Sequence, residues 1–303
     1  MDSKDYIKGS VFLFSLTVLF FVGCSNESPR AKLKVISFNV LCSFCDSSYP
    51  PWDERLEYFK DILERHDADL LGLQELTWPK EVEQILALKD GYKAVYFKGD
   101  KPGDFGMTDY PDATILYKHE RFSLLDSGNY WLSPTPDVAW STGFADGPQF
   151  PRIVVWAMFE DRTTGMDFLF VNTHFDNNSP SQQLSADVLL DRTRDFSKQV
   201  PVLIAGDFNS QPQDPAYAKL VAKSDQGGLD LKNAFDLVSE HDLDSDDQNP
   251  SWDPGTRIDH IFVGGSGSLW KCDKWTVDLH KYGQPPGFPS DHRAIEADLD
   301  LQW

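Results

Sequence analysis

The sequence predicts an α/β protein in which two β-sheets pack face to face and helices cover the outside. Short apolar runs, some continuous and some alternating, are typical of buried and half-buried strands. Segments with apolar residues at helical spacing separate several of these runs. Polar residues recur where the expected strands begin or end. With 303 residues, 41% of them hydrophobic, the chain can build one large core or two small ones.

The first part of the chain reads as strand, helix, strand, helix. Residues 34–40 alternate and then turn apolar, which favours a strand, and Asn39 lies near its end. Leu56, Phe59 and Ile62 repeat at helical spacing and predict a helix over residues 53–66. A short apolar run follows and ends just before Glu75. The elements expected up to the middle of the chain are strands at 34–40, 70–73, 92–97, 112–117 and 130–132 and helices at 53–66 and 78–88.

The second half begins with a Pro/Gly-rich loop over residues 133–151, which we expect to shape the substrate site. Two runs separated by a Thr-Gly turn predict neighbouring strands, and the second leads into His174. An amphipathic segment then predicts a helix. The elements expected here are strands at 153–159, 167–171, 201–205, 258–263 and 294–301 and helices at 185–200 and 215–221.

Residues 201–212, PVLIAGDFNSQP, are the stretch around which the other motifs are organised. An apolar run breaks at Gly206, so that Asp207 and Asn209 lie at the rim of the expected sheet. On a strand-like backbone, side chains two residues apart point the same way. Both offer oxygen to a hard cation or to a phosphoryl group. A plain turn explains this stretch equally well, because its residues are all turn formers.

Residues 1–23 have the features of a secretory leader. Lys4 and Lys8 lie in a short polar head, and residues 11–22 are uncharged and apolar but short for a membrane span. The pattern resembles a bacterial lipoprotein signal peptide cleaved before Cys24, whose thiol would be acylated. Phe21 departs from that pattern, and a signal peptide cut elsewhere or an uncleaved anchor are the alternatives. We expect an exported protein, lipid-anchored to the cell envelope at the periplasmic face or the cell surface, with residues 24–32 as a tether.

The formal charge of −20 limits the partners that we expect. A protein that tracks duplex DNA normally has a basic footprint, because phosphate contacts supply most of the affinity. This chain lacks one globally, so extended duplex DNA is not expected as a partner. The six acids within residues 236–247 are most simply a solvated loop. We expect a monomer.

Three cysteines remain if Cys24 is lipidated. Cys42 and Cys45 form a C-x-x-C pair that can close a small disulfide in an oxidising compartment, or stay as free thiols like Cys272. A redox role would need a thioredoxin-like context, which is absent, and a metal site would need more ligands.

Six short motifs share one property: each stands at the end or start of an expected strand. They are SFN at Asn39, LQE at Glu75, NTH at His174, GDFN at Asp207 and Asn209, RIDH at Asp259, and SDH at Asp291 and His292. Together and in this order they resemble the endonuclease/exonuclease/phosphatase superfamily, which has the DNase I-like fold. The resemblance covers about residues 33–303, the expected catalytic domain. GDFNSQP and the Pro-Ala-Tyr that follows look most similar to the branch with the deadenylase-like members.

The resemblance implies a four-layered α/β sandwich that cleaves phosphoester bonds with Mg²⁺ or Mn²⁺. In that family pattern Glu75 matches the main metal ligand, with Asn39 and Asp291 nearby. His292 matches the general base that activates water, and Asp259 matches the carboxylate that orients it.

The remaining positions of the pattern concern the phosphoryl group. Asp207 and Asn209 match residues that position the nucleophile and this group. His174 matches a histidine that stabilises the transition state or assists the leaving oxygen.

Three further residues are considered outside the motifs. Arg152, at a strand start, can hold a phosphate oxygen bidentately or form an ordinary surface salt bridge. His260 points to the opposite face from Asp259 and is left out of the site. Asp112 stands where relatives carry a polar active-site residue, but its local match is poor.

The leading hypothesis is an exported, metal-dependent phosphoesterase acting on a phosphodiester or phosphomonoester, with a small or lipid-linked substrate. A nuclease or nucleotide phosphodiesterase is the alternative within the same chemistry, because one fold hosts both. A non-catalytic surface binding protein is a remote alternative, since none of the matched residues is missing. We expect residues 42–52, 98–112 and 133–151 to determine specificity.

Overall fold

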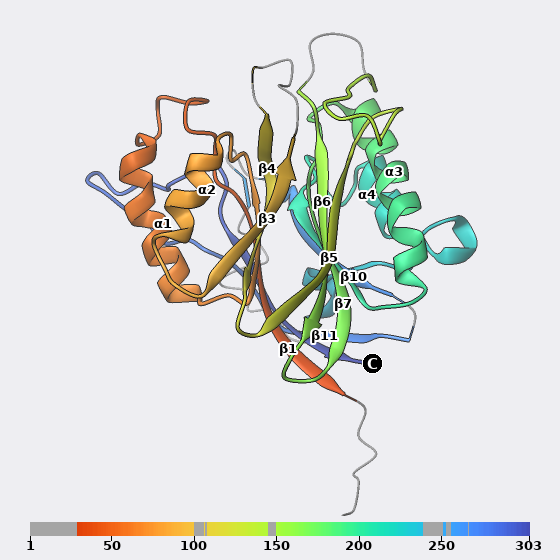
Figure 1. The fold of residues 1–303 in the computed structure, drawn as a ribbon. Helices are drawn as coiled ribbons and strands as arrows, with labels where there is room; N and C mark the ends of the chain where they lie inside the picture. Colours follow the sequence, from red (N-terminus) through yellow and green to blue (C-terminus); the bar gives the residue numbers. More distant parts are fainter. Residues whose placement is uncertain are drawn as a thin grey trace, which may run out of the picture.

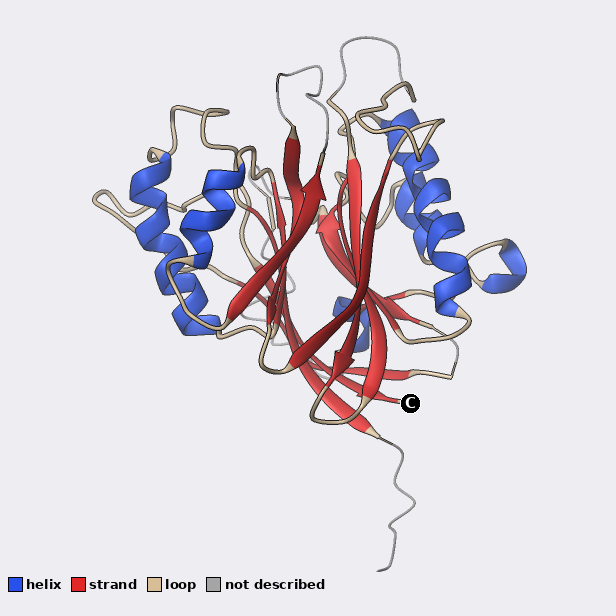
Figure 2. Cartoon of the chain, in the orientation of Figure 1, coloured by secondary structure: helices blue, strands red, loops and turns tan. Residues whose placement is uncertain are grey.

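The computed structural model describes residues 29–99, 106, 108–144, 150–238, 251–252, 256–265 and 267–303. Two mixed sheets, each of six strands, lie face to face. In Figure 1, helices α1 (Trp52–His66) and α2 (Pro79–Leu86) flank one sheet, and α3 (Ser179–Ser197) and α4 (Pro215–Leu220) flank the other. Figure 2 shows the same helix–sheet–sheet–helix layering by secondary structure. The predicted sandwich of two packed sheets with outer helices is confirmed.

The first sheet has the strand order β11-β12-β1-β2-β4-β3. Its strands are β1 (Arg30–Asn39), β2 (Leu70–Gln74), β3 (Tyr92–Lys98), β4 (Asp109–Lys118), β11 (Leu269–Val277) and β12 (Ile295–Gln302). Among the described pairs of this sheet, only β1 and β2 run parallel. A parallel pair needs a crossover, which α1 supplies.

The second sheet has the strand order β5-β6-β7-β8-β10-β9. Its strands are β5 (Phe122–Trp131), β6 (Ile153–Asp161), β7 (Met166–His174), β8 (Val202–Asp207), β9 (Lys232–Asn233) and β10 (Asp259–Gly264). Here β7 and β8 are the parallel pair among the described strands, and α3 makes the crossover. Both sheets therefore contain one parallel pair whose strands end at the same edge.

The core between the sheets is apolar except for a polar bridge that lies close to the strand ends. Asn172 of β7 donates through Nδ2 to the carbonyls of Leu73 and Thr114 in the other sheet, at 2.9 Å each. Gln74 donates through Nε2 to Asn172 Oδ1 at 2.8 Å. Gly72 is needed here, because a Cβ would come within 2.6 Å of Asn172 Oδ1. These buried bonds fix how the two sheets meet near the site residues.

Several elements differ from the sequence-based expectation. Strand β11 was not expected, because its buried and exposed residues do not alternate regularly. Strand β5 extends back to Phe122, well before the predicted start at residue 130. The early part was not predicted because its central residues are mostly exposed and do not alternate between apolar and polar. Helix α3 begins at Ser179, where Pro180 occupies the first turn, rather than at residue 185. Two short helices, α5 (Ala234–Leu237) and the 3₁₀ turn η1 (Ser224–Gln226), complete the described elements.

The predicted leader and Cys24 lie outside the described residues. Strand β1 begins at Arg30, inside the stretch expected to be a tether. Among the described helices, none combines the length and the apolar character that a membrane crossing requires.

Candidate active site

The six motifs meet at one edge of the sandwich, where the two parallel pairs end. Asn39 ends β1, and Glu75 directly follows β2. His174 ends β7, and Asp207 ends β8. Asp259 begins β10 and pairs in register with Asp207, so it reaches the same edge from the opposite direction. The sequence expectation that these residues lie at strand ends is confirmed.

Asn39 connects the two sheets at the centre of this edge. Its Nδ2 donates to Glu75 Oε1 at 2.9 Å and to Asp207 Oδ2 at 3.0 Å, and lies 3.5 Å from His292 Nε2. Its Oδ1 accepts from the backbone of Leu41 at 3.0 Å. The amide is fully buried, so its hydrogen bonds are not exchanged with water. Asn39 therefore holds two carboxylates and a histidine in fixed relation.

His292 forms an acid–histidine pair across the sheets. It precedes β12 of the first sheet, and its Nδ1 lies 2.9 Å from Oδ2 of Asp259 in the second. Its Nε2 lies 3.6 Å from Asp207 Oδ2. Burial alone would lower the pKa of His292, but the carboxylates of Asp259 and Asp207 outweigh it and raise that pKa. Asp259 accepts from Nδ1–H, so Nε2 is the ring nitrogen turned toward the other site residues.

His174 forms a second histidine–carboxylate pair, in which the sheets that supply the histidine and the acid are exchanged. It belongs to the second sheet, and its Nδ1 lies 3.0 Å from Oδ1 of Asp112 in β4 of the first. Burial and the charge of Arg152 both act to lower the pKa of His174, but the Asp112 carboxylate outweighs them and raises it. His174 Nε2 lies 3.5 Å from Asp207 Oδ2, the same oxygen that faces His292. Both histidines thus meet at one carboxylate oxygen.

Arg152, which the sequence suggested as a phosphate-binding candidate, lies against the ring of His174. Its Nη1 is 2.9 Å from Nδ1 and 3.1 Å from Nε2. A group almost equidistant from both ring nitrogens lies over the ring rather than in line with either one. Asp112 Oδ2 is 3.9 Å from the same guanidinium nitrogen. Arg152 therefore belongs to the site edge and is not an isolated surface salt bridge.

Asp112 is a site residue that the sequence reasoning did not commit to. It is 3% exposed, and its Oδ1 also accepts from the backbone N–H of Glu75 at 2.9 Å. Burial would raise the pKa of this carboxyl, yet the neighbouring His174 and Arg152 lower it. The signal available in the sequence was an Asp at the start of an apolar run, the same pattern as the recognised strand-end acids.

Asp291 is tied to the end of β1 through Ser290. The Ser290 hydroxyl donates to the Asn39 carbonyl at 2.8 Å and lies 3.3 Å from Asp291 Oδ1. The backbone N–H of His292 donates back to Ser290 Oγ at 3.1 Å. Asp291 is partly exposed, while its neighbour His292 is buried. The SDH motif is therefore docked beside Asn39, as expected.

The expected strand-like geometry through Asn209 is wrong. Strand β8 stops at Asp207, and Asn209 has φ 47°, in the left-handed region that Asn tolerates better than most residues. The Asn209 backbone N–H donates to Asp207 Oδ1 at 2.9 Å, and its Nδ2 donates to the Phe175 carbonyl at 3.0 Å. Asn209 thus lies next to Asp207, but its side-chain amide nitrogen is bonded to the backbone of the second sheet.

His260 is correctly left out of the site. It is buried on the other face of β10, where its Nε2 lies 2.8 Å from the Ser210 carbonyl and its Nδ1 lies 3.0 Å from Asn233 Nδ2. Burial lowers its pKa to about 4, so this ring stays neutral. Its role is to hold the segment that follows Asp207.

A buried arginine that the sequence did not single out supports the loop after β1. Arg55 of α1 is 2% exposed and donates to the carbonyls of Val40, Leu41 and Cys42, at 2.6, 2.7 and 3.2 Å. The backbone N–H of Cys42 in turn donates to Glu75 Oε2 at 2.9 Å. Cys42 and Cys45 form a disulfide, one of the two predicted states, and Cys272 is a buried free thiol.

The donor set suits a hard divalent cation. Five carboxylates gather at this edge (Glu75, Asp112, Asp207, Asp259 and Asp291), and oxygen is the ligand atom that Mg²⁺ and Mn²⁺ prefer. Within the described part of the chain, buried Asp259 Oδ1 and Asp112 Oδ2 have no hydrogen-bond partner. An oxygen of Asp207, an oxygen of Asp259 and a nitrogen of His292 also lie within 4.8 Å of one another. This surplus of negative charge fits a bound cation.

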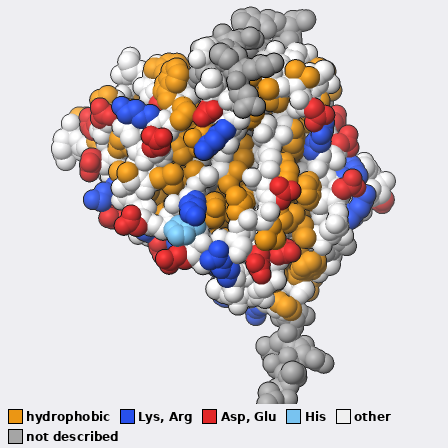
Figure 3. Space-filling model, viewed as in Figure 1, with side chains coloured by type: hydrophobic (Ala, Val, Ile, Leu, Met, Phe, Trp, Pro, Cys, Tyr) orange, Lys and Arg blue, Asp and Glu red, His pale blue; other side chains and the backbone are white. Residues whose placement is uncertain are grey.

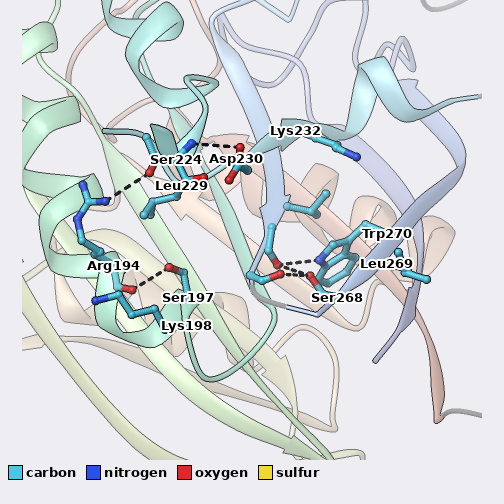
Figure 4. A pocket seen from close by; sticks show the side chains of 14 residues that line it. Arg194, Ser197, Lys198, Ser224, Leu229, Asp230, Lys232, Ser268, Leu269 and Trp270 are labelled. Atoms are coloured by element: carbon cyan, nitrogen blue, oxygen red, sulfur yellow. Dashed lines mark hydrogen bonds between the residues drawn. The ribbon is translucent and has the colours of Figure 1, made fainter. Parts of the chain in front are cut away.

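The largest described cavity lies elsewhere and carries no comparable chemistry. It has a volume of about 480 Å³ and is lined by the end of α3, the turn near Ser224 and the β10–β11 connection, where β8 begins rather than ends. Figure 4 shows Arg194 and Ser197 bonded to backbone carbonyls, and Ser268 and Trp270 bonded to the Gly264 carbonyl at the end of β10. The candidate site therefore remains the edge that carries the motifs.

Comparison with known proteins agrees with this geometry. The model of the Endonuclease/Exonuclease/phosphatase family matches residues 36–292. A relative from Aspergillus niger, the CCR4-Not complex 3'-5'-exoribonuclease subunit Ccr4, is 26% identical over a match that covers 92% of this chain. The chain spans only 53% of that relative's length.

Two solved structures from Bacteroides thetaiotaomicron share the fold. A member of the endonuclease/exonuclease/phosphatase family has TM-score 0.75 and 23% identity, covering 90% of this chain and 99% of that one. A mannosyl-6-phosphatase has TM-score 0.73 and 24% identity, covering 88% and 99%. Members of the matching family generally depend on a divalent metal. The chain belongs to the Endonuclease/Exonuclease/phosphatase family and is a hydrolase that acts on phosphoester bonds.

Proposed function

We propose that this protein cleaves the phosphoester of a small substrate by attack of a water molecule that the His292–Asp259 pair activates, with Mg²⁺ or Mn²⁺ as cofactor. The observation that carries the proposal is the meeting of two histidine–carboxylate pairs at Asp207 Oδ2, beside Glu75. Each pair joins the two sheets, so the reacting groups are held by the rigid part of the fold.

In this mechanism His292 removes a proton from the attacking water. Asp259 holds Nδ1 at 2.9 Å and fixes the tautomer, so that Nε2 is the atom that accepts the proton. Asp207 lies 3.6 Å from Nε2 and stabilises the imidazolium that results. Asn209 stabilises Asp207 through its backbone N–H.

His174 and Arg152 form the cationic side of the site. Arg152 Nη1 lies over the His174 ring, and both groups can face the oxygens of a pentavalent phosphorus. Asp112 orients His174 through its contact with Nδ1 and also accepts a hydrogen bond from the backbone N–H of Glu75. The two groups would stabilise the negative charge that develops on the phosphoryl oxygens and the leaving oxygen.

The metal would be held by Glu75 and Asp291, with Asn39 beside them. When bound, a divalent ion neutralises phosphate charge and lowers the pKa of water. Glu75 is prepared for this role, because Asn39 and the Cys42 backbone fix both of its oxygens. Asn39 also separates the Glu75 and Asp207 carboxylates by donating to each.

The acidic chain favours a small or lipid-linked phosphodiester or phosphomonoester over long nucleic acid. The formal charge is −20, and on the face in Figure 3 Lys and Arg side chains lie singly among acidic and hydrophobic ones. A nuclease or nucleotide phosphodiesterase is the second candidate, supported by the similarity to the Ccr4 subunit. The similarity to the mannosyl-6-phosphatase supports a small monoester.

We also propose that the protein is exported and anchored to the bacterial envelope through lipidated Cys24. The polar head, the apolar run and the small residue before Cys24 support this. Metabolic labelling with a fatty acid tests it: the parent should be labelled and pelleted with membranes, and Cys24→Ala should be unlabelled. Equal labelling of both would refute lipidation at this residue.

The test of the activity is hydrolysis of p-nitrophenyl phosphate and bis-p-nitrophenyl phosphate with Mg²⁺, Mn²⁺ or EDTA. Glu75→Ala and His292→Ala should abolish a metal-dependent activity. Glu120→Ala and His119→Ala, at the far end of β4, are matched controls that should retain it. The preferred ester separates a monoesterase from a diesterase. Full activity in EDTA, or in both site variants, would refute the mechanism.

A further inference from the structure

A cavity of about 400 Å³ opens directly beside Glu75, and its walls are largely aromatic. Glu75, Asp112 and Arg152 line it, and in the proposed mechanism Glu75 holds the metal while Arg152 faces the phosphoryl oxygens. Most of the other lining side chains present an apolar surface: Cys42, Phe44, Cys45, Leu76, Trp78 and Phe150. The volume is in the range of small-molecule sites.

The rings in this wall are unusually exposed for their size. Phe44 is 70% exposed, Phe150 is 65% and Trp78 is 43%. Large apolar side chains exposed together at one place commonly mark a binding surface. All three lie on loops that follow or precede site strands, so whatever covers them also approaches Glu75 and Arg152.

The disulfide presents Phe44 to the cavity in a fixed position. Cys42 and Cys45 enclose it in a closed turn, and Arg55 bonds the carbonyl of Cys42 at 3.2 Å. The same Cys42 donates its backbone N–H to Glu75. The loop that carries the ring is therefore anchored to the proposed metal ligand.

The polarity of the wall determines which chemical group fits. A polyhydroxylated ring would need several donors and acceptors around it, because an unpaired hydroxyl is costly to bury. Besides Glu75, Asp112 and Arg152, the described lining has three polar side-chain groups: the Thr77 hydroxyl, the Trp78 indole N–H and the Tyr110 hydroxyl. The Tyr110 hydroxyl already donates to the Pro151 carbonyl at 3.1 Å. Flat aromatic rings stack on aromatic side chains without needing such partners.

We propose that this cavity is the subsite for the ester group of the substrate, and that it accepts a planar aromatic ring, such as a nucleobase, stacked on Trp78 and Phe44. The inference rests on the proposed function, since it takes the phosphoryl group to lie between the metal ligand Glu75 and Arg152.

The test compares two substrates with one leaving group. Adenosine 5'-phosphate and ribose 5-phosphate differ only by the base, so any difference reports on the ring. If the enzyme is a diesterase, their methyl esters replace them. For the parent, kcat/KM should be at least about ten-fold higher with the base, through KM. Trp78→Ala and Phe44→Ala should remove that preference, by raising KM for adenosine 5'-phosphate toward the KM for ribose 5-phosphate.

Trp303→Ala is the matched control, because Trp303 is 40% exposed and lies on the opposite end of β12, away from the cavity. It should keep the preference for the base. Octyl phosphate and ethyl phosphate form a second pair. A preference for the octyl chain without a preference for the base would overturn the inference and identify the cavity as an alkyl site.

A binding measurement separates the two hypotheses. Adenosine 5'-phosphate should quench Trp78 fluorescence, seen as the difference between the parent and Trp78→Phe, with EDTA present. Quenching in EDTA, with no hydrolysis of any of the esters once Mg²⁺ or Mn²⁺ is supplied, would refute the proposed function and retain the subsite. Hydrolysis of both ribose esters at equal kcat/KM, without quenching, would retain the function and overturn the subsite.

Discussion

The two histidine–carboxylate pairs of the site have similar geometry but different neighbours. In each, a histidine of one sheet lies about one hydrogen bond from an acid of the other: 2.9 Å for His292 and Asp259, 3.0 Å for His174 and Asp112. Only the His174 pair has Arg152 stacked on its ring, and only its acid also bonds the Glu75 backbone. The contrast indicates a division of labour, in which one pair moves a proton and the other holds charge and geometry.

Removal of His292 should have the largest effect. His292→Ala should lower kcat by about 10³-fold or more, because the general base is lost. Asp259→Asn should cost less, about 10- to 100-fold, because the ring remains but loses its orientation. Steady-state kinetics beside circular dichroism tests this. Equal losses in the two variants would show that Asp259 does more than orient the ring.

The same comparison predicts a smaller and different effect for the other pair. Asp112→Asn removes the charge beside His174 and weakens the acceptor for the Glu75 backbone, so kcat should fall about 10-fold. The apparent affinity for Mn²⁺ should fall as well, measured by metal titration of activity and by isothermal titration calorimetry. Unchanged metal affinity would sever the inferred link between Asp112 and Glu75.

A third histidine–acid cluster, built from residues outside the site motifs, provides a structural reference. His66 lies 2.7 Å from Glu296 and 3.0 Å from Asp278. Burial would lower the pKa of His66, but the two acids outweigh it and raise that pKa. The unfolded chain therefore releases this proton at lower pH than the folded one.

The sign of the pH effect follows. Stability from His66 is fully present below the ordinary histidine pKa and is lost as the pH rises through the raised, folded value. The free energy of unfolding, from urea titrations between about pH 6 and about pH 9, should fall more steeply in the parent than in His66→Gln. Parallel slopes would show that the cluster is not a charged histidine pair.

The smallest expected effect concerns the disulfide. Cys42→Ser with Cys45→Ser should raise KM for an aromatic ester about three-fold, because the loop with Phe44 loosens at modest cost. kcat should change little, since no catalytic step uses either sulfur. Reduction of the parent with dithiothreitol should have the same effect as the double variant, and a large loss of kcat would favour a chemical role for the thiols.

The sequence allowed the two-sheet fold and the strand-end residues to be predicted because both leave local signals. An apolar run that stops at Asp207 or Glu75 is visible in one dimension. Asp112 was considered but not assigned to the site, and Arg55 was missed, because their roles depend on partners from other elements: His174 for Asp112 and the carbonyls after β1 for Arg55. The backbone conformation at Asn209 was mispredicted, because Asn occurs in both extended and left-handed conformations and the sequence does not distinguish them.

The strand order of the first sheet has a consequence for the timing of folding. Strand β1, near the start of the described chain, pairs with β12 at its very end, with Arg30 opposite Gln302. Asp291 and His292 arrive just before that last strand. A chain made from its amino end cannot complete this sheet until residues 295–302 have been synthesised, and such long-range closure is slow. The site should therefore be completed only when β12 docks beside β1, because Asp291 and His292 directly precede that strand.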